Sequence, residues 1–370
     1  MYIKSLKLQN FRNYADESFA FDPAVNLICG ENGQGKTNLL EAAAACSTMR
    51  LFRTAQKKEG LRFGENHAFI FADFLAQERD ISLELRFSRT KAMEIYKNGV
   101  RQKRQSDAQG LLKTVLFCPE DLMLVRAGAA ARRRFLDTAL CQMRPNYARY
   151  LEEYNRLHEH KTRILRDSEE KPSLLSMWED FSLRMAHIGA RIIRYRAYYC
   201  RKLLKAAAAV YADIAPHEVL SGVYKTVSSV TDPFADARTI EKQLIDHVFS
   251  HKTAEIAAKS CLSGPHKDDL ELLLDGRSAA SFGSQGQVRT CTLSLKLAER
   301  ELFFDEDGEY PVLLLDDVLS ELDRRRQDFV LNRISAGQVM ITCCEDGISE
   351  KLRAGAVFHI QNGEKSAEIH

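Results

Sequence analysis

The hydrophobic positions of this 370-residue chain follow several different patterns. Apolar and polar residues alternate over residues 3–8 and again between 68 and 96, which predicts half-buried strands, and Asn98-Gly99 predicts a type I′ hairpin turn. Apolar runs at 25–29, 115–117, 312–315 and 339–342 predict buried strands. Between about 145 and 200 the apolar residues recur at helical spacing, with a break at Pro172. We therefore expect an α/β core that carries an added antiparallel sheet and an inserted helical arm.

A glycine-rich loop joins one predicted buried strand to a helix-forming run that starts at Asn38. Glycines let backbone N–H groups point inward at a phosphate, and the helix N-terminus adds partial positive charge. The sequence thus predicts an ATP site in which Lys36 bridges the β- and γ-phosphates and the Thr37 hydroxyl holds Mg²⁺. A chance glycine turn is the alternative, and the flanking strand and helix disfavour it. The expected nucleotide contacts are Gly30, Asn32, Gly33, Gln34, Gly35, Lys36, Thr37 and Asn38.

Two adjacent acids follow the apolar run at 312–315. Carboxylates at the C-terminal end of a strand lie where ligands bind in open α/β sheets. Asp316 suits the surroundings of Mg²⁺, and Asp317 can orient or deprotonate the attacking water. A buried strand capped by a helix-starting Asp is the alternative, and the upstream glycine loop favours the catalytic interpretation.

A second loop, residues 281–290, is polar, contains glycine and leads into a helix that carries Leu293, Leu295, Lys296, Leu297 and Glu299. Because a helix N-terminus attracts anions, this loop predicts a second anion-binding site. Its candidate catalytic residues are Ser284 and Gln287, and Gly286 is a candidate nucleotide contact.

The net charge of +2 conceals a basic segment. Residues 126–205 hold 18 Lys and Arg against 9 Asp and Glu, which suggests a polyanionic partner for this segment. On the second predicted helix the cations form one stripe. The alternative is a solvated face neutralised by Glu152, Glu153 and Glu159. The candidate DNA contacts are Arg132, Arg133, Arg134, Arg191, Arg194 and Arg201.

These patterns predict an ATPase lobe made of residues 1–125 and 256–370 and a helical arm domain at 126–255. The chain has no run of eighteen apolar residues, and its start reads as a strand, so we expect a cytoplasmic protein without membrane contact. The nine cysteines are scattered without C-x-x-C spacing, which suggests neither a disulfide framework nor a zinc site.

With these motifs in this order, the chain resembles the ABC-type ATPases of the SMC branch, and among them the RecF family of bacterial recombination mediators. The resemblance covers nearly the full length. Its most specific segments are the Ser284–Gln287 loop and the Gly264–Asp269 block, whereas the glycine loop is shared by many families. Further matching segments are 10–14, 118–122, 132–137, 313–317 and 320–323.

The resemblance implies a homodimer that forms when ATP binds. In it Ser284, Gly286 and Gln287 of one subunit contact the γ-phosphate held by Lys36 of the other. It also implies that Arg12 belongs to the nucleotide site. Such a clamp on DNA marks single-strand gaps at duplex junctions, works with RecO and RecR, and promotes the loading of RecA.

Three departures from the ABC pattern imply slow hydrolysis that serves as a timer. Asp317 stands where a Glu is usual, Cys343 stands where a His is usual, and Glu120 and Asp121 lie roughly where a glutamine is usual. Two other classes compete with the clamp. A P-loop kinase for a small molecule does not need the Ser284 loop, and the ATPase subunit of a transporter does not need a large basic arm.

Overall fold

The computed structural model describes residues 1–54, 56–227, 229–344 and 355–365. The chain divides into two compact units, which are described separately. Unit 1 comprises Met1–Met123 and Thr292–His370, and unit 2 comprises Leu124–Cys291. Within the described ranges, none of the helices combines the length and apolar character needed to span a bilayer.

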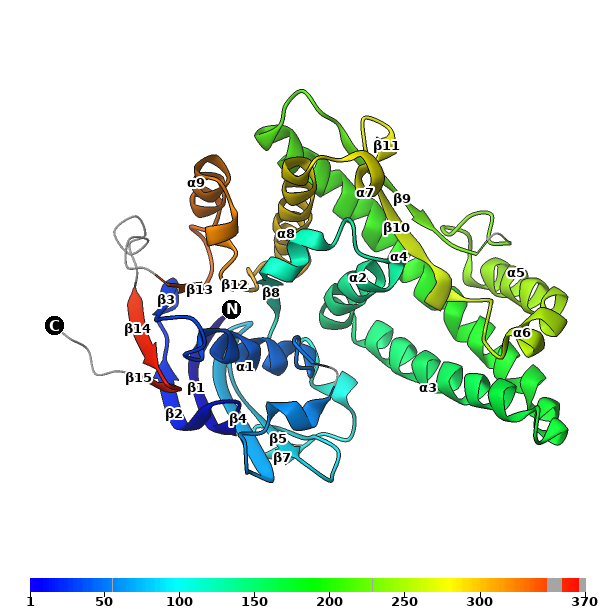
Figure 1. Ribbon diagram of the computed structural model, residues 1–370, viewed down its shortest axis with the longest axis horizontal. Coiled ribbons are helices and arrows are strands. Elements are labelled where there is room, and N and C mark those ends of the chain that lie inside the picture. The colour runs from blue at the N-terminus through cyan, green and yellow to red at the C-terminus, as the bar shows by residue number, and fades with distance from the viewer. Residues whose placement is uncertain (55, 228, 345–354, 366–370) are drawn as a thin grey trace. The chain divides into compact units, whose positions relative to one another are not determined.

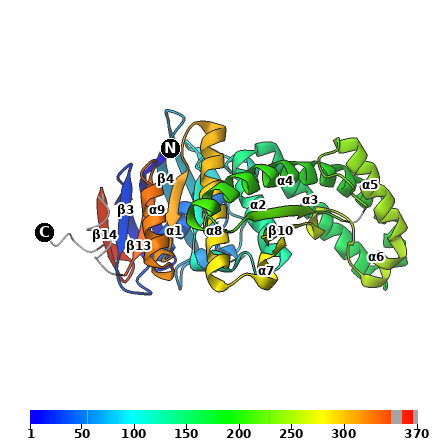
Figure 2. The ribbon, with the colours of Figure 1, turned by 90° about the horizontal axis from the view of Figure 1, so that it is seen from above.

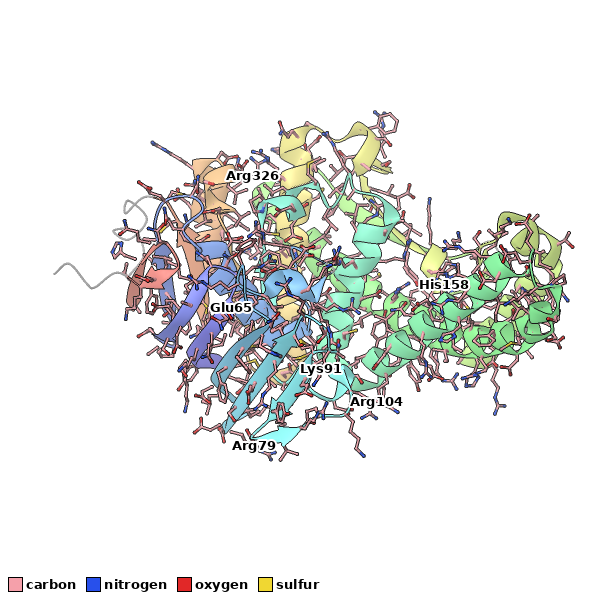
Figure 3. All side chains as sticks on the ribbon, turned by 60° about the horizontal axis from the view of Figure 1, so that its bottom comes forward. Glu65, Arg79, Lys91, Arg104, His158 and Arg326 are labelled. Atoms are coloured by element: carbon pink, nitrogen blue, oxygen red, sulfur yellow. The ribbon has the colours of Figure 1, made fainter. Side chains whose placement is uncertain are left out.

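Unit 1 contains an antiparallel sheet with the strand order β2-β1-β4-β5-β6-β7 (Figure 1). Its strands are β1 Tyr2–Phe11, β2 Tyr14–Ala20, β4 His67–Ala76, β5 Arg79–Ser88, β6 Glu94–Lys97 and β7 Val100–Arg101. Buried and accessible positions alternate along β4, as the sequence predicts. Asn98 and Gly99 both have positive φ, which confirms the type I′ turn. Exposed cations such as Arg79, Lys91 and Arg104 lie on the periphery of this sheet (Figure 3).

The second sheet of unit 1 has the order β15-β14-β3-β13-β12-β8, and all pairs except β14–β15 are parallel. Its strands are β3 Val25–Cys29, β8 Thr114–Phe117, β12 Val312–Leu315, β13 Val339–Cys343, β14 Ala356–Gln361 and β15 Glu364–Lys365. The helices and 3-10 turns of the unit are α1 Lys36–Thr48, η1 Lys57–Gly60, η2 Gln105–Asp107, η3 Pro119–Met123, η6 Leu319–Glu321 and α9 Arg324–Arg333. One core joins residues of both sheets with Leu39, Leu40 and the alanines of α1.

Unit 2 is a helical arm with a small sheet against its longest helix (Figure 2). Its helices are α2 Ala129–Met143, α3 Pro145–Asp167, α4 Trp178–Ile214, α5 Ala237–Ser250, α6 Lys252–Ala258 and α7 Ala279–Phe282. Its short 3-10 turns are η4 Pro172–Met177 and η5 Pro265–Lys267. The sheet has the order β11-β10-β9, with β9 Leu220–Lys225, β10 Asp269–Leu274 and β11 Arg277–Ser278. The helix α8 Gln285–Asp307 begins in this unit and ends in unit 1.

The sequence predicts helix throughout residues 126–252, and the strand β9 corrects this. β9 pairs with β10 along six residues, from Leu220 opposite Leu274 to Lys225 opposite Asp269. This pairing joins residues beyond 255 to the arm, so the compact unit runs on to Cys291 instead of ending at the predicted boundary. Long-range strand pairing of this kind cannot be read from local periodicity.

The Gly264–Asp269 block is a structural centre of unit 2. The guanidinium of Arg196 on α4 is buried, pairs with both carboxylate oxygens of Asp137 at 2.9 Å, and donates to the Pro265 carbonyl at 2.7 Å. Asp268 lies 3.5 Å from the same guanidinium and accepts a hydrogen bond from Tyr224. The block therefore links α2, α4 and β9 through one buried cation.

A buried acid in α8 makes the stability of unit 1 depend on pH. Burial raises the pKa of Glu299 to about 7, Lys296 opposes this rise, and Glu299 Oε2 has no hydrogen-bond partner among the described residues. Because this pKa is higher in the folded than in the unfolded chain, protonation of Glu299 contributes stability that is lost as the pH rises through the folded pKa.

We expect Glu299→Gln to become more stable than the native chain as the pH rises from about 5.5 to about 8. The gain should reach about 2–3 kcal/mol, since one pKa unit corresponds to about 1.4 kcal/mol. Urea unfolding at the two pH values measures the difference. The exposed Asp305→Asn on the same helix is the control and should show no such trend. A pH-independent difference for Glu299→Gln would contradict the assignment.

Candidate functional site

The glycine loop has the backbone that a phosphate-binding loop requires. Gly30, Gly33 and Gly35 have φ values of 150°, 82° and 123°, in the region that side chains disfavour. At two of these positions a side chain also has no room. A Cβ on Gly30 would lie 2.4 Å from the Ile360 carbonyl oxygen, and one on Gly35 would lie 2.7 Å from the Asn13 amide nitrogen.

Side-chain and backbone donors from outside the loop hold this shape. The Gln34 carbonyl accepts hydrogen bonds from Asn13 Nδ2 at 2.8 Å and from the Gly363 N–H at 2.9 Å. Asn38 donates to Asn13 Oδ1 at 2.8 Å, and the Tyr14 hydroxyl donates to the Gly35 carbonyl at 3.0 Å. Asn13 is a site residue that the sequence patterns do not single out, although it lies in the segment 10–14 that carries part of the resemblance.

Lys36 is buried, and its ammonium group is held by carbonyl oxygens. It donates to the carbonyls of Gly30 at 2.6 Å and Glu31 at 3.1 Å, and Cys344 Sγ lies 3.4 Å away. Within the described part of the chain, no carboxylate forms an ion pair with Lys36. A buried cation without a counter-ion favours the binding of an anion at this loop.

Asp316 at the end of β12 meets the first turn of α1. Its Oδ1 accepts hydrogen bonds from Thr37 at 2.9 Å and from Thr342 at 3.0 Å, and its side chain is buried. Burial raises the pKa of Asp316, the two threonine hydroxyls lower it, and the negative charges of Asp317 and Glu120 raise it further. A buried carboxylate beside a hydroxyl and two further acids fits Mg²⁺, which Thr37 and Asp316 would hold.

Asp317 lies beside Asp316 in a left-handed conformation, with φ of 49°. Its N–H donates to Thr342 Oγ1 at 2.7 Å, and its side chain is half-buried. The backbone conformation turns the chain at the end of β12 and places this second carboxylate next to the first. This arrangement is compatible with the predicted role of Asp317 toward an attacking water.

Glu120 and Asp121 behave differently, although they are neighbours in η3. Asp121 accepts a hydrogen bond from the Cys118 N–H at 3.1 Å and pairs with Lys296 at 3.2 Å. Glu120 is exposed, and its charge raises the pKa of Asp316. Of the two acids that lie where a glutamine is usual, Glu120 therefore acts on Asp316 electrostatically and Asp121 holds the turn.

The guanidinium of Arg12 forms hydrogen bonds with other residues of unit 1. It forms a two-pronged ion pair with the buried Glu41, at 2.7 and 3.1 Å, and also donates to the Glu59 carbonyl at 2.8 Å. Arg53, which the sequence patterns do not single out, is exposed and donates to Asn38 Oδ1 at 3.1 Å. Arg53 thus brings a second cation to the first turn of α1. Its position in a polar loop with Lys57 and Lys58 is the signal that the sequence offers for it.

The two cysteines at the end of β13 have different surroundings, and Cys343, the residue expected where a His is usual, does not contact the glycine loop through a hydrogen bond that the described residues show. Cys343 is buried, and its Sγ lies 3.0 Å from Cys29 Sγ. Successive residues of a strand point to opposite sides. The next residue, Cys344, is the one that reaches Asn32 and Lys36 of the glycine loop.

The Ser284 loop belongs to unit 2 and leads into a helix, as predicted, but α8 already begins at Gln285, so the second half of the predicted loop is helical. The Ser284 N–H donates to Gln287 Oε1 at 2.7 Å, and the Gln287 N–H donates to Ser284 Oγ at 3.2 Å. This reciprocal pair is a capping box, which satisfies the first donors of the helix. Gln287 also donates to Glu218 at 2.8 Å, whereas Ser284 is exposed and Gly286 half-buried.

The predicted DNA-contact arginines fall into two groups. Arg132 pairs with both oxygens of Asp269, at 2.7 and 2.8 Å, and Arg133 donates to the Asp268 carbonyl at 2.7 Å. Both therefore have structural partners inside unit 2, while Arg134 on the same helix is exposed.

The stripe on α4 is only partly neutralised by acids. Arg184 lies 4.0 Å from Glu153. At this residue the structure therefore shows the alternative, neutralisation by an acid of the neighbouring helix. The guanidinium of Arg201 instead lies over the rings of Tyr198 and Phe234, at 4.9 and 4.8 Å from their centres. Arg194 lies near the Tyr198 ring, and Arg191 lies near Tyr150 and donates to the His187 carbonyl.

The P-loop, the paired acids at the end of β12 and the capped Ser284 loop define an ATPase head of the ABC type. The RecF/RecN/SMC N terminal domain matches residues 2–366. A "DNA replication and repair protein RecF" from Clostridium tetani is 35% identical, with 98% of this chain and 99% of the relative covered. A protein of the same name from Bacillus cytotoxicus is 37% identical, with 100% and 99% covered. The chain therefore belongs to the RecF family.

Solved structures agree with this assignment. A structure described as the recombination mediator protein RecF with ATP in the RecFOR pathway is 32% identical, with a TM-score of 0.91 over 99% of this chain and 98% of that one. An Smc head domain from Pyrococcus furiosus has a TM-score of 0.55, over 99% of this chain and 95% of that one, at 14% identity, so this likeness shows the fold alone.

Replacement of Asn13 tests whether the held shape of the loop matters for binding. Asn13→Ala removes two hydrogen bonds that fix residues 34 and 38, so nucleotide affinity should fall about tenfold. Titration with a fluorescent ATP analogue measures the affinity. The matched control is Asn66→Ala, an exposed asparagine before β4, which should bind as the native chain does. Equal affinities for the two variants would show that Asn13 does not support the loop.

Proposed function

We propose that this protein is an ATP-dependent DNA-binding clamp that acts in recombinational repair and replication restart. The observation that carries the proposal is the pairing of Thr37 with Asp316 beside the uncompensated Lys36. Together they offer a cation for the β- and γ-phosphates and a hydroxyl and carboxylate for Mg²⁺. Relatives at 34–37% identity are named DNA replication and repair proteins, and a related structure is described with ATP, which supports the same role.

In the proposed mechanism two subunits form a dimer because each ATP contacts both of them. One subunit holds ATP with its P-loop, and Ser284, Gly286 and Gln287 of the partner subunit contact the γ-phosphate. The exposed hydroxyl of Ser284 at a helix N-terminus supports this role. Hydrolysis is slow because Asp317 is one methylene shorter than the usual glutamate.

DNA binding is assigned to the exposed cations of the arm. Arg134 on α2 and Arg201 on α4 are the strongest candidates, and the half-buried Arg191 and Arg194 also lie on α4. Arg132 and Arg133 contribute to DNA binding indirectly. Both are bonded to the Asp268–Asp269 segment and so hold α2 in position. We propose that the clamp binds single-strand gaps at duplex junctions, works with RecO and RecR, and promotes the loading of RecA. A related structure is described as part of the RecFOR pathway, which supports these partners.

Two substitutions separate the two halves of the nucleotide site. Ser284→Arg leaves Lys36, Thr37 and Asp316 intact, so the variant should bind ATP with near-native affinity. A bulky Arg would protrude into both nucleotide sites of a two-fold dimer, so the variant should remain monomeric and hydrolyse almost no ATP. Asp317→Asn should instead form an ATP dimer that persists, because the water is no longer activated. Light scattering with and without ATP measures the dimer, and phosphate release measures hydrolysis.

Lys36→Met is the control that removes ATP binding, dimerisation and hydrolysis together. The clamp is wrong if Ser284→Arg dimerises normally or hydrolyses ATP as a monomer. A native chain that stays monomeric at all ATP concentrations would favour the small-molecule kinase, because only the clamp needs a second subunit.

Charge reversal tests the arm. Arg134→Glu and Arg201→Glu should each weaken DNA binding and flatten its salt dependence by about one unit of log slope for each phosphate that the variant no longer binds. Gel shifts with gapped, single-stranded and duplex DNA, in ATP and in ADP, measure both effects. Arg184→Glu is the matched control on α4, because Glu153 already lies beside that cation. Slopes that stay unchanged in both variants would assign these arginines to the fold or to a protein partner.

A further inference from the structure

Two aromatic rings and two arginines meet on the arm, and we call these four residues the ring cluster. Tyr198, Arg194 and Arg201 lie on α4, and Phe234 lies between β9 and α5. The two rings meet edge to face, with 5.3 Å between their centres. The Arg201 guanidinium lies 4.9 and 4.8 Å from these two centres, and the Arg194 guanidinium lies 5.9 Å from the centre of the Tyr198 ring. Both cations are therefore held by aromatic rings.

The two cations of the ring cluster keep their charge for a ligand. Among the residues that the structure describes, neither Arg194 nor Arg201 forms an ion pair with an acid, and Arg194 Nε is buried without a hydrogen-bond partner. The two acids beside Phe234 in the sequence, Asp232 and Asp236, accept hydrogen bonds from backbone N–H groups instead. A ring attracts a guanidinium without neutralising it, so both cations favour an anion.

The Tyr198 ring lies between these cations and is accessible. Arg194 precedes Tyr198 by four residues and Arg201 follows it by three, spacings that place all three on one face of α4. Tyr198 is 39% exposed even with the contacts of the ring cluster, so part of its surface is open to a ligand. Anchoring the Phe234 segment to α4 requires an apolar contact but not an exposed ring between two cations.

An exposed ring between two cations fits an unpaired nucleotide. The base of such a nucleotide has a free face that stacks on an aromatic side chain, and the phosphates on either side of it bind guanidinium groups. In a duplex the neighbouring bases of the stack cover that face. A duplex can therefore use the cations of the ring cluster but not its ring, whereas a single strand can use both.

We propose that Tyr198 is a base-stacking residue that makes the arm prefer unpaired nucleotides to duplex DNA. Phe234 and the two arginines hold the ring in place, and the arginines bind the phosphates beside the stacked base. This inference rests on the DNA binding of the proposed function and adds the residue that distinguishes the two forms of DNA at a junction. The cations supply affinity for any strand, and the ring supplies the preference.

The test replaces the ring without changing the charge. Tyr198→Leu in the full chain, with Mg²⁺ and ATP, should bind a single-stranded oligodeoxynucleotide about tenfold more weakly than the native chain does. Its affinity for a blunt duplex of the same length should be that of the native chain, and its salt dependence should be unchanged because no cation is removed. Fluorescence anisotropy over a salt series measures both. A 2-aminopurine base in the single strand, whose fluorescence stacking quenches, should be quenched less by Tyr198→Leu than by the native chain.

Two further variants make the test specific. Tyr198→Phe keeps the ring and should bind both forms of DNA as the native chain does. Phe249→Leu removes another exposed ring of the same unit, 40% exposed on α5, and should leave both affinities unchanged. Unchanged single-strand affinity in Tyr198→Leu, or equal losses for single strand and duplex, would overturn the inference and leave the proposed function standing. A native chain that binds neither form of DNA would instead overturn the proposed function.

Discussion

The hydrogen bond from Thr37 to Asp316 is the interaction on which the nucleotide site depends. Thr37 lies at the start of α1, directly after the loop that follows β3, and Asp316 lies at the end of β12, two strands away in the sheet. Thr342 at the end of the intervening β13 completes the row, since its hydroxyl donates to Asp316 and accepts from the Asp317 N–H. Three parallel strands end at one edge, and this row aligns their polar residues there.

The charges of this site are complementary to a magnesium nucleotide. Lys36 is a buried cation that donates hydrogen bonds to two carbonyls. Asp316 is a buried carboxylate that accepts hydrogen bonds from two hydroxyls and lies near two further acids. Each of these groups is costly to bury without a partner of opposite charge. Phosphate oxygens would satisfy the first, and a divalent cation would satisfy the second.

In the arm, a single buried cation, Arg196, connects segments that are distant in the sequence. Arg196 binds Asp137 and the Pro265 carbonyl, and Asp268 lies beside it, so a segment after the helices is tied to α2 and α4. Arg132 and Arg133 bond the same segment from α2. Arg134 and Arg201 are instead among the exposed cations of the arm, so the arginines that build the arm differ from those that face solvent.

The sequence by itself determined the local chemistry of this protein. The strand, the glycine loop and α1 could be predicted because their signals are contiguous, and so could the acids after β12 and the polar loop that precedes α8. The alternating antiparallel sheet and the helical spacing of α3 and α4 were equally readable. These features depend on neighbours within a few residues, where periodicity and turn chemistry are decisive.

Only the tertiary structure decided which distant residues meet. The pairing of β9 with β10, the ion pair of Arg12 with Glu41 and that of Arg132 with Asp269 join segments whose partners no local pattern names. The same holds for Asn13 under the loop and for the different positions of Cys343 and Cys344. An arginine in a sequence carries the same charge whether it lies in solvent or against a carboxylate, and only the folded chain fixes that partner.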